Sequence, residues 1–336
     1  MDSELIEEAI EKSFIARDKM LVVSSCPLRI SLVGGSTDHP HFLERYGYGS
    51  VISFPSNLRT YSTVHRDKFG ANSVKSNYVL NYSRREEVDT IEEIQNELVR
   101  HCFSEFNVEE MNLFFTSDVY SSGSGLATSS AYLMSLIKAI HSLDGKGINN
   151  LEICEKAMEI EKKFNPLVGQ QDFYGSLSGF KRIDFFDSRL PKIKYLSSEI
   201  LDRMDMFLIH TGVSRNSTEV LKSINVANSF PLLKDVSDLG KAISDRDIEF
   251  FNSIIRRTWD NKKKTSPMIC GSPELKELDE KLSADRNVLS HKLLGAGNGG
   301  YFLVFTEKNS GDWVYNSYNR VMKIKMSDAG IKTTIH

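Results

Sequence analysis

The segment that most constrains this chain is a run of serine and glycine at residues 121–130, which lies between a strand-like and a helix-like stretch. Residues 111–117 before the run predict a strand, and residues 128–143 carry apolar side chains at helical spacing. Glycines let a backbone approach an anion closely, a helix N-terminus supplies free N–H groups, and hydroxyls can bind phosphate oxygen or Mg²⁺. A strand, a glycine loop and a helix in this order predict a phosphate-binding loop into which a triphosphate fits.

The same run has a second interpretation, a flexible linker whose Ser or Thr side chain caps the helix. The flanking strand and helix favour the phosphate loop. A Walker A loop is excluded, because the pattern G-x-x-x-x-G-K-[ST] needs a lysine that this run does not contain. The chain is therefore not a P-loop NTPase.

A second glycine cluster, at residues 295–300, formally matches the dinucleotide pattern G-x-G-x-x-G. That pattern must open a helix and lead into a second strand, whereas this cluster leads directly into strand-like residues 301–305 near the end of the sequence. A nicotinamide dehydrogenase is disfavoured. The cluster predicts a glycine turn between two strands, either structural or allowing a ligand to approach the backbone.

A third segment, residues 26–39, places Arg29 inside an apolar strand-like run that ends in a glycine turn with Asp38. A buried arginine without a partner is costly, so an acidic partner or a phosphate is expected. The alternative is a surface arginine on an edge strand. His39 and His41 could suggest a metal site, but no third ligand has a recognisable spacing.

A fourth segment runs from a predicted helix that carries Glu161 through Asp172 to residues 175–179. Taken alone, a helical glutamate is usually solvated and an aspartate can cap a turn. Residues 175–179 lack the central serine of a G-x-S-x-G nucleophile elbow, which disfavours a hydrolase.

Composition points to a small-molecule partner. The 336 residues include 42 Lys and Arg against 45 Asp and Glu, a net charge of −3, without the basic excess that nucleic acid or an anionic membrane requires. The four cysteines form no C-x-x-C pair, no run approaches a membrane span, and the first residues are too charged for a signal peptide. We expect a cytoplasmic protein with reduced thiols.

Helical and strand patterns are mixed without a regular βαβ repeat, which favours an α+β fold over a doubly wound one. Thr90 and Glu93 form a capping box for a helix to about residue 106. Helices are also predicted over residues 4–18, 128–143 and 150–164, with a mainly helical region to residue 286. Strands are predicted at residues 20–24, 27–33, 49–54, 58–65, 78–82, 111–117, 181–186, 204–210, 290–294, 301–305 and 331–335.

Three of these segments, in this order, resemble the motifs of the GHMP kinases, the superfamily of galactokinase and of homoserine, mevalonate and phosphomevalonate kinases. They are residues 27–38, residues 123–130 and residues 293–300. The strings LRISLVGGSTD, GQQDFYGS and HTGVSR are most similar to the D-glycero-D-manno-heptose 7-phosphate kinases. The resemblance implies a two-domain α+β fold. An S5 domain 2-like domain would span residues 1–200, and a ferredoxin-like domain residues 201–336.

The resemblance also implies roles for single residues. Asp172 would face the acceptor hydroxyl as general base or orienting group, and Arg29 would keep it ionised and neutralise transition-state charge. Ser129 and Glu161 would hold Mg²⁺ on the β- and γ-phosphates. The ATP phosphates would bind to Ser122, Gly123, Ser124, Gly125, Leu126, Ala127, Thr128, Ser129 and Ser130.

The sugar would bind to Asp38, with Gly35, Thr37, Gly297 and Asn298 beside it. Arg215 is the candidate for a phosphate already on the sugar, because a guanidinium can bind it in a bidentate way.

Some positions depart from the family pattern: Ala127 and Thr128 replace Gly and Ser, Ser36 replaces a third glycine, and Lys162 replaces a frequent arginine. Asn298 interrupts a glycine run, but Asn tolerates left-handed backbone, and Ala127 fits if its φ is negative.

The expected activity is an ATP- and Mg²⁺-dependent phosphoryl transfer to the anomeric hydroxyl of a heptose 7-phosphate, feeding nucleotide-activated heptose for surface polysaccharide. A hexose or fucose 1-kinase and a non-catalytic sugar sensor of the same fold are alternatives. The sensor is disfavoured because a non-catalytic binder has no need of all four residues with expected catalytic roles, Arg29, Ser129, Glu161 and Asp172. The partners would be ATP and a sugar phosphate, without nucleic acid or membrane, and the chain could form a homodimer.

Overall fold

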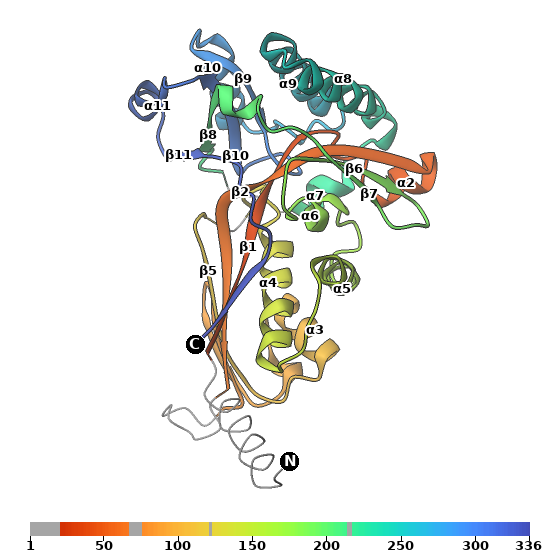
Figure 1. The fold of residues 1–336 in the computed structure, drawn as a ribbon, viewed down its shortest axis with the longest axis vertical. Helices are drawn as coiled ribbons and strands as arrows, with labels where there is room; N and C mark the ends of the chain where they lie inside the picture. The colour runs from red at the N-terminus through yellow and green to blue at the C-terminus, as the bar shows by residue number, and fades with distance from the viewer. Residues whose placement is uncertain (1–20, 67–75, 121–122, 214–216) are drawn as a thin grey trace, which may run out of the picture.

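The computed structural model describes residues 21–66, 76–120, 123–213 and 217–336 (Figure 1). The helix expected at residues 4–18 lies outside the described residues. Two sheets organise the described part, and the larger one has its strands in the order β12-β1-β2-β5-β3-β4, with β6 pairing with β2 and β7 with β6. These strands are β1 Leu21–Val33, β2 Tyr48–His65, β3 Tyr78–Asn81, β4 Arg85–Val88, β5 Met111–Ser117, β6 Lys181–Phe186, β7 Lys192–Tyr195 and β12 Lys332–Ile335.

The antiparallel pair β1 and β2 forms the centre of this sheet. The sequence predicts each of these strands as two pieces, and the structure joins the pieces into one long, bent strand. The pairing register shifts between Pro27 and Arg29 and again between Ser31 and Val33. Such irregularities bend a strand and redirect its side chains, which explains both the interrupted sequence pattern and the inward position of Arg29.

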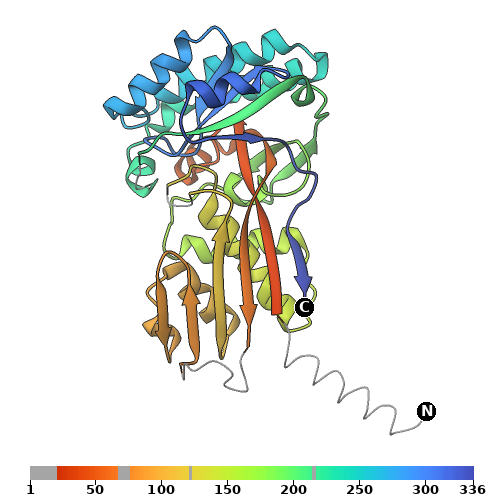
Figure 2. The ribbon, with the colours of Figure 1, turned by 90° about the vertical axis from the view of Figure 1, so that its left-hand side faces the viewer.

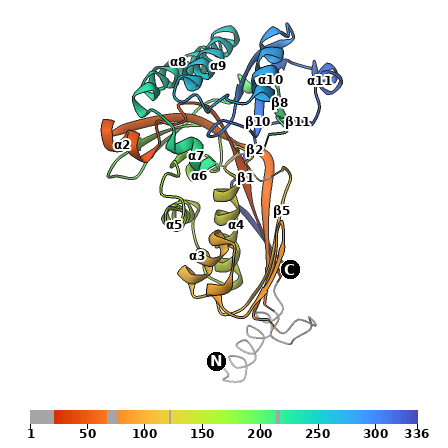
Figure 3. The same ribbon diagram turned by 180° about the vertical axis from the view of Figure 1, so that it is seen from behind.

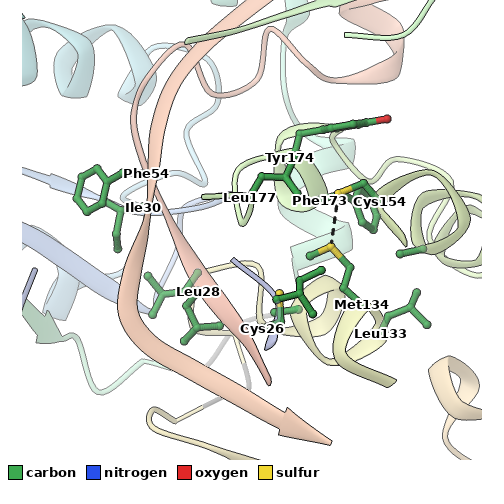
Figure 4. Close-up of a cluster of buried hydrophobic side chains, with 14 of the residues drawn as sticks. Cys26, Leu28, Ile30, Phe54, Leu133, Met134, Cys154, Phe173, Tyr174 and Leu177 are labelled. Atoms are coloured by element: carbon green, nitrogen blue, oxygen red, sulfur yellow. Dashed lines mark hydrogen bonds between the residues drawn. The ribbon is translucent and has the colours of Figure 1, made fainter. Parts of the chain in front are cut away.

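Helices cover one face of this sheet (Figure 3). The central helix, α4 Thr128–Leu143, packs against β1 and β2, and α3 Glu97–Phe106 and α5 Asn150–Lys162 lie beside it. Apolar side chains from β1, β2, α4, α5 and the short helix α6 Gln171–Tyr174 meet in the core shown in Figure 4. Phe173 and Tyr174 are buried there and anchor α6.

The smaller sheet has the order β11-β8-β10-β9, all antiparallel. It lies at the other end of the molecule with its own helices (Figure 2). Its strands are β8 Met204–His210, β9 Val288–Leu293, β10 Tyr301–Glu307 and β11 Val321–Ile324. The helices are α7 Ser217–Lys222, α8 Pro231–Asp245, α9 Ile248–Lys263, α10 Pro273–Ala284 and α11 Gly311–Ser317.

The capping box of Thr90 and Glu93 is present, but it caps a single 3₁₀ turn, Ile91–Glu93. The helix α3 that follows begins later and has its own cap, because the Asn96 side chain accepts a hydrogen bond from the Val99 N–H. The prediction of one continuous helix was therefore wrong. Five further elements were not predicted, and all are four to seven residues long: β4, β7, β11, α11 and α2 Pro40–Tyr46.

The mixture of helices and mainly antiparallel strands confirms the predicted α+β class. The two sheets separate between Tyr195 and Met204, but β12, from the end of the sequence, pairs with β1 in the larger sheet. The division into residues 1–200 and 201–336 remains a prediction. Among the described residues, no helix is long and apolar enough to span a membrane.

Candidate active site

A cavity of about 500 Å³ lies where the end of β1, the loop before α4, α5, α6 and α9 meet. Many residues that the sequence analysis selected line it, from segments far apart in the chain. They are Arg29, Asp38, Gly123, Ser124, Gly125, Ala127, Thr128, Ser129, Ser130, Glu161 and Asp172.

Arg29 connects two of the predicted motifs. Its Nε and Nη2 donate to Oδ1 of Asp172 at 3.1 and 2.6 Å, and its Nη1 donates to the carbonyl of Gly125 at 2.7 Å. The acidic partner expected for a buried arginine is therefore Asp172, 143 positions later in the sequence. One rigid guanidinium fixes the carboxylate relative to the glycine loop.

Asp172 occupies the first turn of α6, whose Phe173 and Tyr174 are buried in the core. Its side chain is 25% exposed, whereas that of Arg29 is 3% exposed. Both bonds from Arg29 end on Oδ1, so Oδ2 remains the oxygen that an acceptor hydroxyl could approach.

The glycine loop enters α4 through alternating left-handed residues. Gly123, Gly125 and Ala127 have φ of 64°, 76° and 59°. Ala127 therefore does not meet the condition of a negative φ. The loop keeps the left-handed conformation that glycine prefers, at a cost of roughly 1–2 kcal/mol for alanine. The first backbone bond of α4 runs from the Ala131 N–H to the Ala127 carbonyl. The earlier N–H groups thus lie at the open, positive end of the helix.

Gly300 brings the C-terminal glycine cluster against this loop. It has a φ of 95°, and a Cβ added to it would lie 2.4 Å from the Ser124 carbonyl oxygen and 2.8 Å from that of Gly123. No side chain fits in that space, so a glycine is required for the two loops to touch.

Glu161 comes from the last turn of α5 and is 3% exposed. Its Oε2 accepts a hydrogen bond from Ser130 Oγ at 2.7 Å, and Asn165 Nδ2 donates to Oε1 at 3.4 Å. Burial raises its pKa to about 7. Ser129, the serine selected as a metal ligand, is exposed and lines the same cavity, whereas Ser130 holds the carboxylate.

These groups suit a hard cation. A desolvated carboxylate gains from a nearby positive charge, and Mg²⁺ prefers carboxylate and other oxygen ligands while retaining several waters. Glu161 and Ser129 supply such oxygens at the cavity wall.

Asp38 is 1% exposed at the turn after β1. Gln171 donates to both of its oxygens, from the backbone N–H to Oδ2 and from Nε2 to Oδ1, each at 3.0 Å. Burial, followed by the charge of Asp172, raises the pKa of Asp38 to about 6. Asp38 and Asp172 thus line the same cavity.

The other described residues predicted to lie beside the sugar are not among those that line the large cavity. Thr37 is fully buried, and its hydroxyl shares one proton between the Gly34 and Ser50 carbonyls while accepting from the Ser50 N–H, so it holds the turn together. Gly35 lines a neighbouring cavity of about 20 Å³. Gly297 lies against Ile269, and the Asn298 N–H donates to the Ile269 carbonyl.

From the glycine cluster, Gly295 and Ala296 reach the large cavity. Asn298 has a φ of 59°, as expected for a residue that tolerates left-handed backbone. Leu126, a residue of the glycine loop, is fully buried. Ser122 and Arg215 lie outside the described residues.

Sequence reasoning missed Lys262 of α9, which also lines the cavity. His39 lies there as well, although the sequence analysis considered it only as a metal ligand. Nothing in the sequence marks Lys262, because it is one of three consecutive lysines on an amphipathic helix.

Residues 90–180 match the family model described as GHMP kinases N terminal domain. The D-glycero-alpha-D-manno-heptose 7-phosphate kinase of Campylobacter jejuni is 25% identical over 311 residues, covering 84% of this chain and 88% of that protein. The L-fucokinase/L-fucose-1-P guanylyltransferase of Bacteroides fragilis is 27% identical over 196 residues, covering 53% of this chain and 20% of that protein.

A solved structure described as a D-glycero-D-manno-heptose 1-phosphate kinase from Bacteroides thetaiotaomicron has the same fold. The TM-score is 0.73 at 20% sequence identity, covering 93% of this chain and 98% of that one. The two-domain fold that the sequence analysis expected is thereby confirmed.

Proposed function

We propose that this chain is a sugar kinase of the GHMP kind and that it transfers the γ-phosphoryl group of ATP to the anomeric hydroxyl of a heptose 7-phosphate. The product would be the 1,7-bisphosphate, on the way to nucleotide-activated heptose for surface polysaccharide. A cytoplasmic location belongs to this proposal.

The observation that carries the proposal is the bridge made by Arg29. It ties Asp172 to the Gly125 carbonyl of the glycine loop, in one cavity of about 500 Å³. Phosphoryl transfer depends mainly on holding donor and acceptor in line and on neutralising charge. A carboxylate fixed beside a phosphate-binding loop supplies the first of these requirements, and the guanidinium supplies part of the second.

In this proposal the glycine loop and the first turn of α4 hold the ATP phosphates. Asp172 accepts a hydrogen bond, and finally the proton, from the anomeric hydroxyl through Oδ2. Glu161 and Ser129 would hold Mg²⁺, which when bound neutralises charge on the β- and γ-phosphates. Ser130 keeps the Glu161 carboxylate oriented.

The test is ADP release from Mg-ATP with D-glycero-D-manno-heptose 7-phosphate, the unphosphorylated heptose and a panel of hexoses. In the variant D172N we expect kcat to fall by about 10²–10⁴, the usual range for a lost general base, while the dissociation constant for ATP stays within about twofold. Turnover undiminished in D172N would refute the mechanism.

The match to an L-fucokinase supports a second candidate, an L-fucose 1-kinase. Turnover of L-fucose with no turnover of the heptose 7-phosphate would establish it. Absence of turnover with every sugar would favour a non-catalytic sensor.

A further inference from the structure

One corner of the cavity collects hydrogen-bond donors. It lies at the turn after β1 and is completed by α9 from the second half of the chain. Lys262 Nζ donates to Ser36 Oγ across 226 positions of sequence, and Lys262 is 8% exposed. His39 lines the same cavity and is 2% exposed.

His39 presents a donor that the protein leaves unused. Its Nδ1 accepts a hydrogen bond from the His41 N–H at 3.3 Å, so in the neutral ring the proton sits on Nε2. Burial, followed by the charges of His41 and Lys262, lowers the pKa of His39 to about 4, which keeps the ring neutral at pH 7. Nε2 is buried and has no hydrogen-bond partner among the described residues. A buried N–H without an acceptor is costly, and a ligand oxygen would satisfy it.

Ser36 is held in an unusual conformation at this corner. Its φ is 85°, in the region that favours glycine. Non-glycine residues in this region cluster at ligand sites, because the surrounding structure must hold them there. Since Ser36 Oγ accepts from Lys262, its own O–H proton remains available to donate to a ligand.

Basic side chains gather around this corner. Lys262 lowers the pKa of Lys292, after the larger effect of burial, and Arg29 contributes in the same direction. Lys292 Nζ donates hydrogen bonds to the carbonyls of Ser31 and Leu32. The acidic neighbours are Asp38 and Asp172, which line the same cavity, and Asp235, whose charge acts on Lys292. Both oxygens of Asp38 already accept from Gln171, and Asp172 is paired with Arg29.

We propose that Lys262, Ser36 and His39 form the subsite for the phosphate that the acceptor sugar already carries. An ammonium, a hydroxyl and an imidazole N–H give three donors around one charge, which suits a phosphate dianion. The subsite lies beside Asp38 in the cavity. The glycine loop, which would bind ATP, instead contacts Arg29 through the carbonyl of Gly125. This inference deepens the proposed function and rests on it for the identity of the sugar.

The test measures binding without ATP, by calorimetry, of D-glycero-D-manno-heptose 7-phosphate and of the unphosphorylated heptose. In K262Q we expect the Kd for the 7-phosphate to rise about 10- to 100-fold, the range for hydrogen bonds to charged groups, and the Kd for the heptose to change less than about twofold. K262R should restore part of the loss. S36G, which removes the hydroxyl at a φ that glycine accepts, should weaken 7-phosphate binding by about three- to tenfold.

The matched control is K264Q, the same change two positions later at an exposed lysine, which should bind both sugars like the wild type. The proposal is overturned if K262Q loses affinity equally for both sugars, loses none, or instead raises the KM for ATP. The last result would assign the corner to the nucleotide. If the wild type binds the 7-phosphate through Lys262 but shows no turnover with ATP, the subsite stands and the proposed reaction fails.

Discussion

The ion pair of Arg29 and Asp172 connects two parts of the candidate active site, the helix α6 and the glycine loop. The guanidinium is nearly fully buried, and its hydrogen bonds run to a carboxylate on one side and to a backbone carbonyl on the other. The sequence predicted that a buried Arg29 needs an acidic partner or a phosphate, since an unpaired buried cation is costly. It could not name the partner from residue chemistry alone, because the pairing depends on how α6 folds back over β1.

The variant R29K keeps the positive charge but removes the planar group that reaches both partners. Because an ammonium cannot match this fixed pair of directions, we expect kcat to fall by about 10²–10³, as for the loss of an electrostatic contact at a reacting centre. The KM for the sugar should change far less. Steady-state kinetics test this, with K264Q as the control for a surface cation. A kcat equal to that of the wild type would show that charge alone suffices.

The pH dependence of kcat/KM for the acceptor sugar should report on the ionisation of Asp38. Its pKa is raised to about 6, so the carboxyl is ionised above pH 6 and protonated below it. If the ionised form accepts hydrogen bonds from the sugar, kcat/KM for the acceptor should fall about tenfold per pH unit below pH 6. D38N should lack the inflection, and an unchanged inflection in D38N would assign it to another group.

Several residues of the candidate site lie on short elements, and short elements were the hardest to predict from the sequence. The four-residue helix α6 is too short to show a periodic pattern, yet it holds Asp172 and Gln171 in place. The elements β5 and α4 matched their predicted bounds, because each has a clear pattern of apolar residues. Lys262 escaped notice because its role depends on α9 packing across the turn after β1, a contact that no local pattern encodes.

The chain after α6 is held by Lys181, which is fully buried at the start of β6. Its Nζ donates to the carbonyls of Gly175 and Gly179 at 3.0 and 3.1 Å, and also to that of Leu177. K181M would leave three carbonyls without a donor. We expect the free energy of unfolding to drop by roughly 3 kcal/mol or more, measured by urea denaturation. A loss below about 1 kcal/mol would mean that water replaces the ammonium; K192M, at an exposed lysine of β7, is the control.

At the scale of the whole molecule, the two halves of the chain meet at the glycine loop before α4. Gly300, beside β10 of the smaller sheet, packs directly on the carbonyls of Gly123 and Ser124. Lys262 makes a second contact of this kind, to Ser36. The cavity therefore exists only when both halves are in place.

G300A tests this contact. The added methyl group would lie 2.4 Å from the Ser124 carbonyl oxygen at a φ of 95°, so the loops must separate. We expect the KM for ATP to rise at least about tenfold and the stability to fall by roughly 2 kcal/mol, the usual scale for strain at such a position. G240A, the same change within α8 where no atom lies within 4 Å, should leave the KM unchanged. Equal kinetics for both variants would contradict the contact's role.

The pairing of β12 with β1 has a consequence for biosynthesis. Val22 lies opposite Ile335, so the first strand of the larger sheet receives its outer neighbour from residues made more than 300 positions later. The smaller sheet is thus an insertion within the larger one. While the ribosome is still making residues 204–324, one edge of β1 has no partner strand, and an open edge invites pairing with other chains. Aggregation during synthesis should therefore depend on how soon the last strand is released.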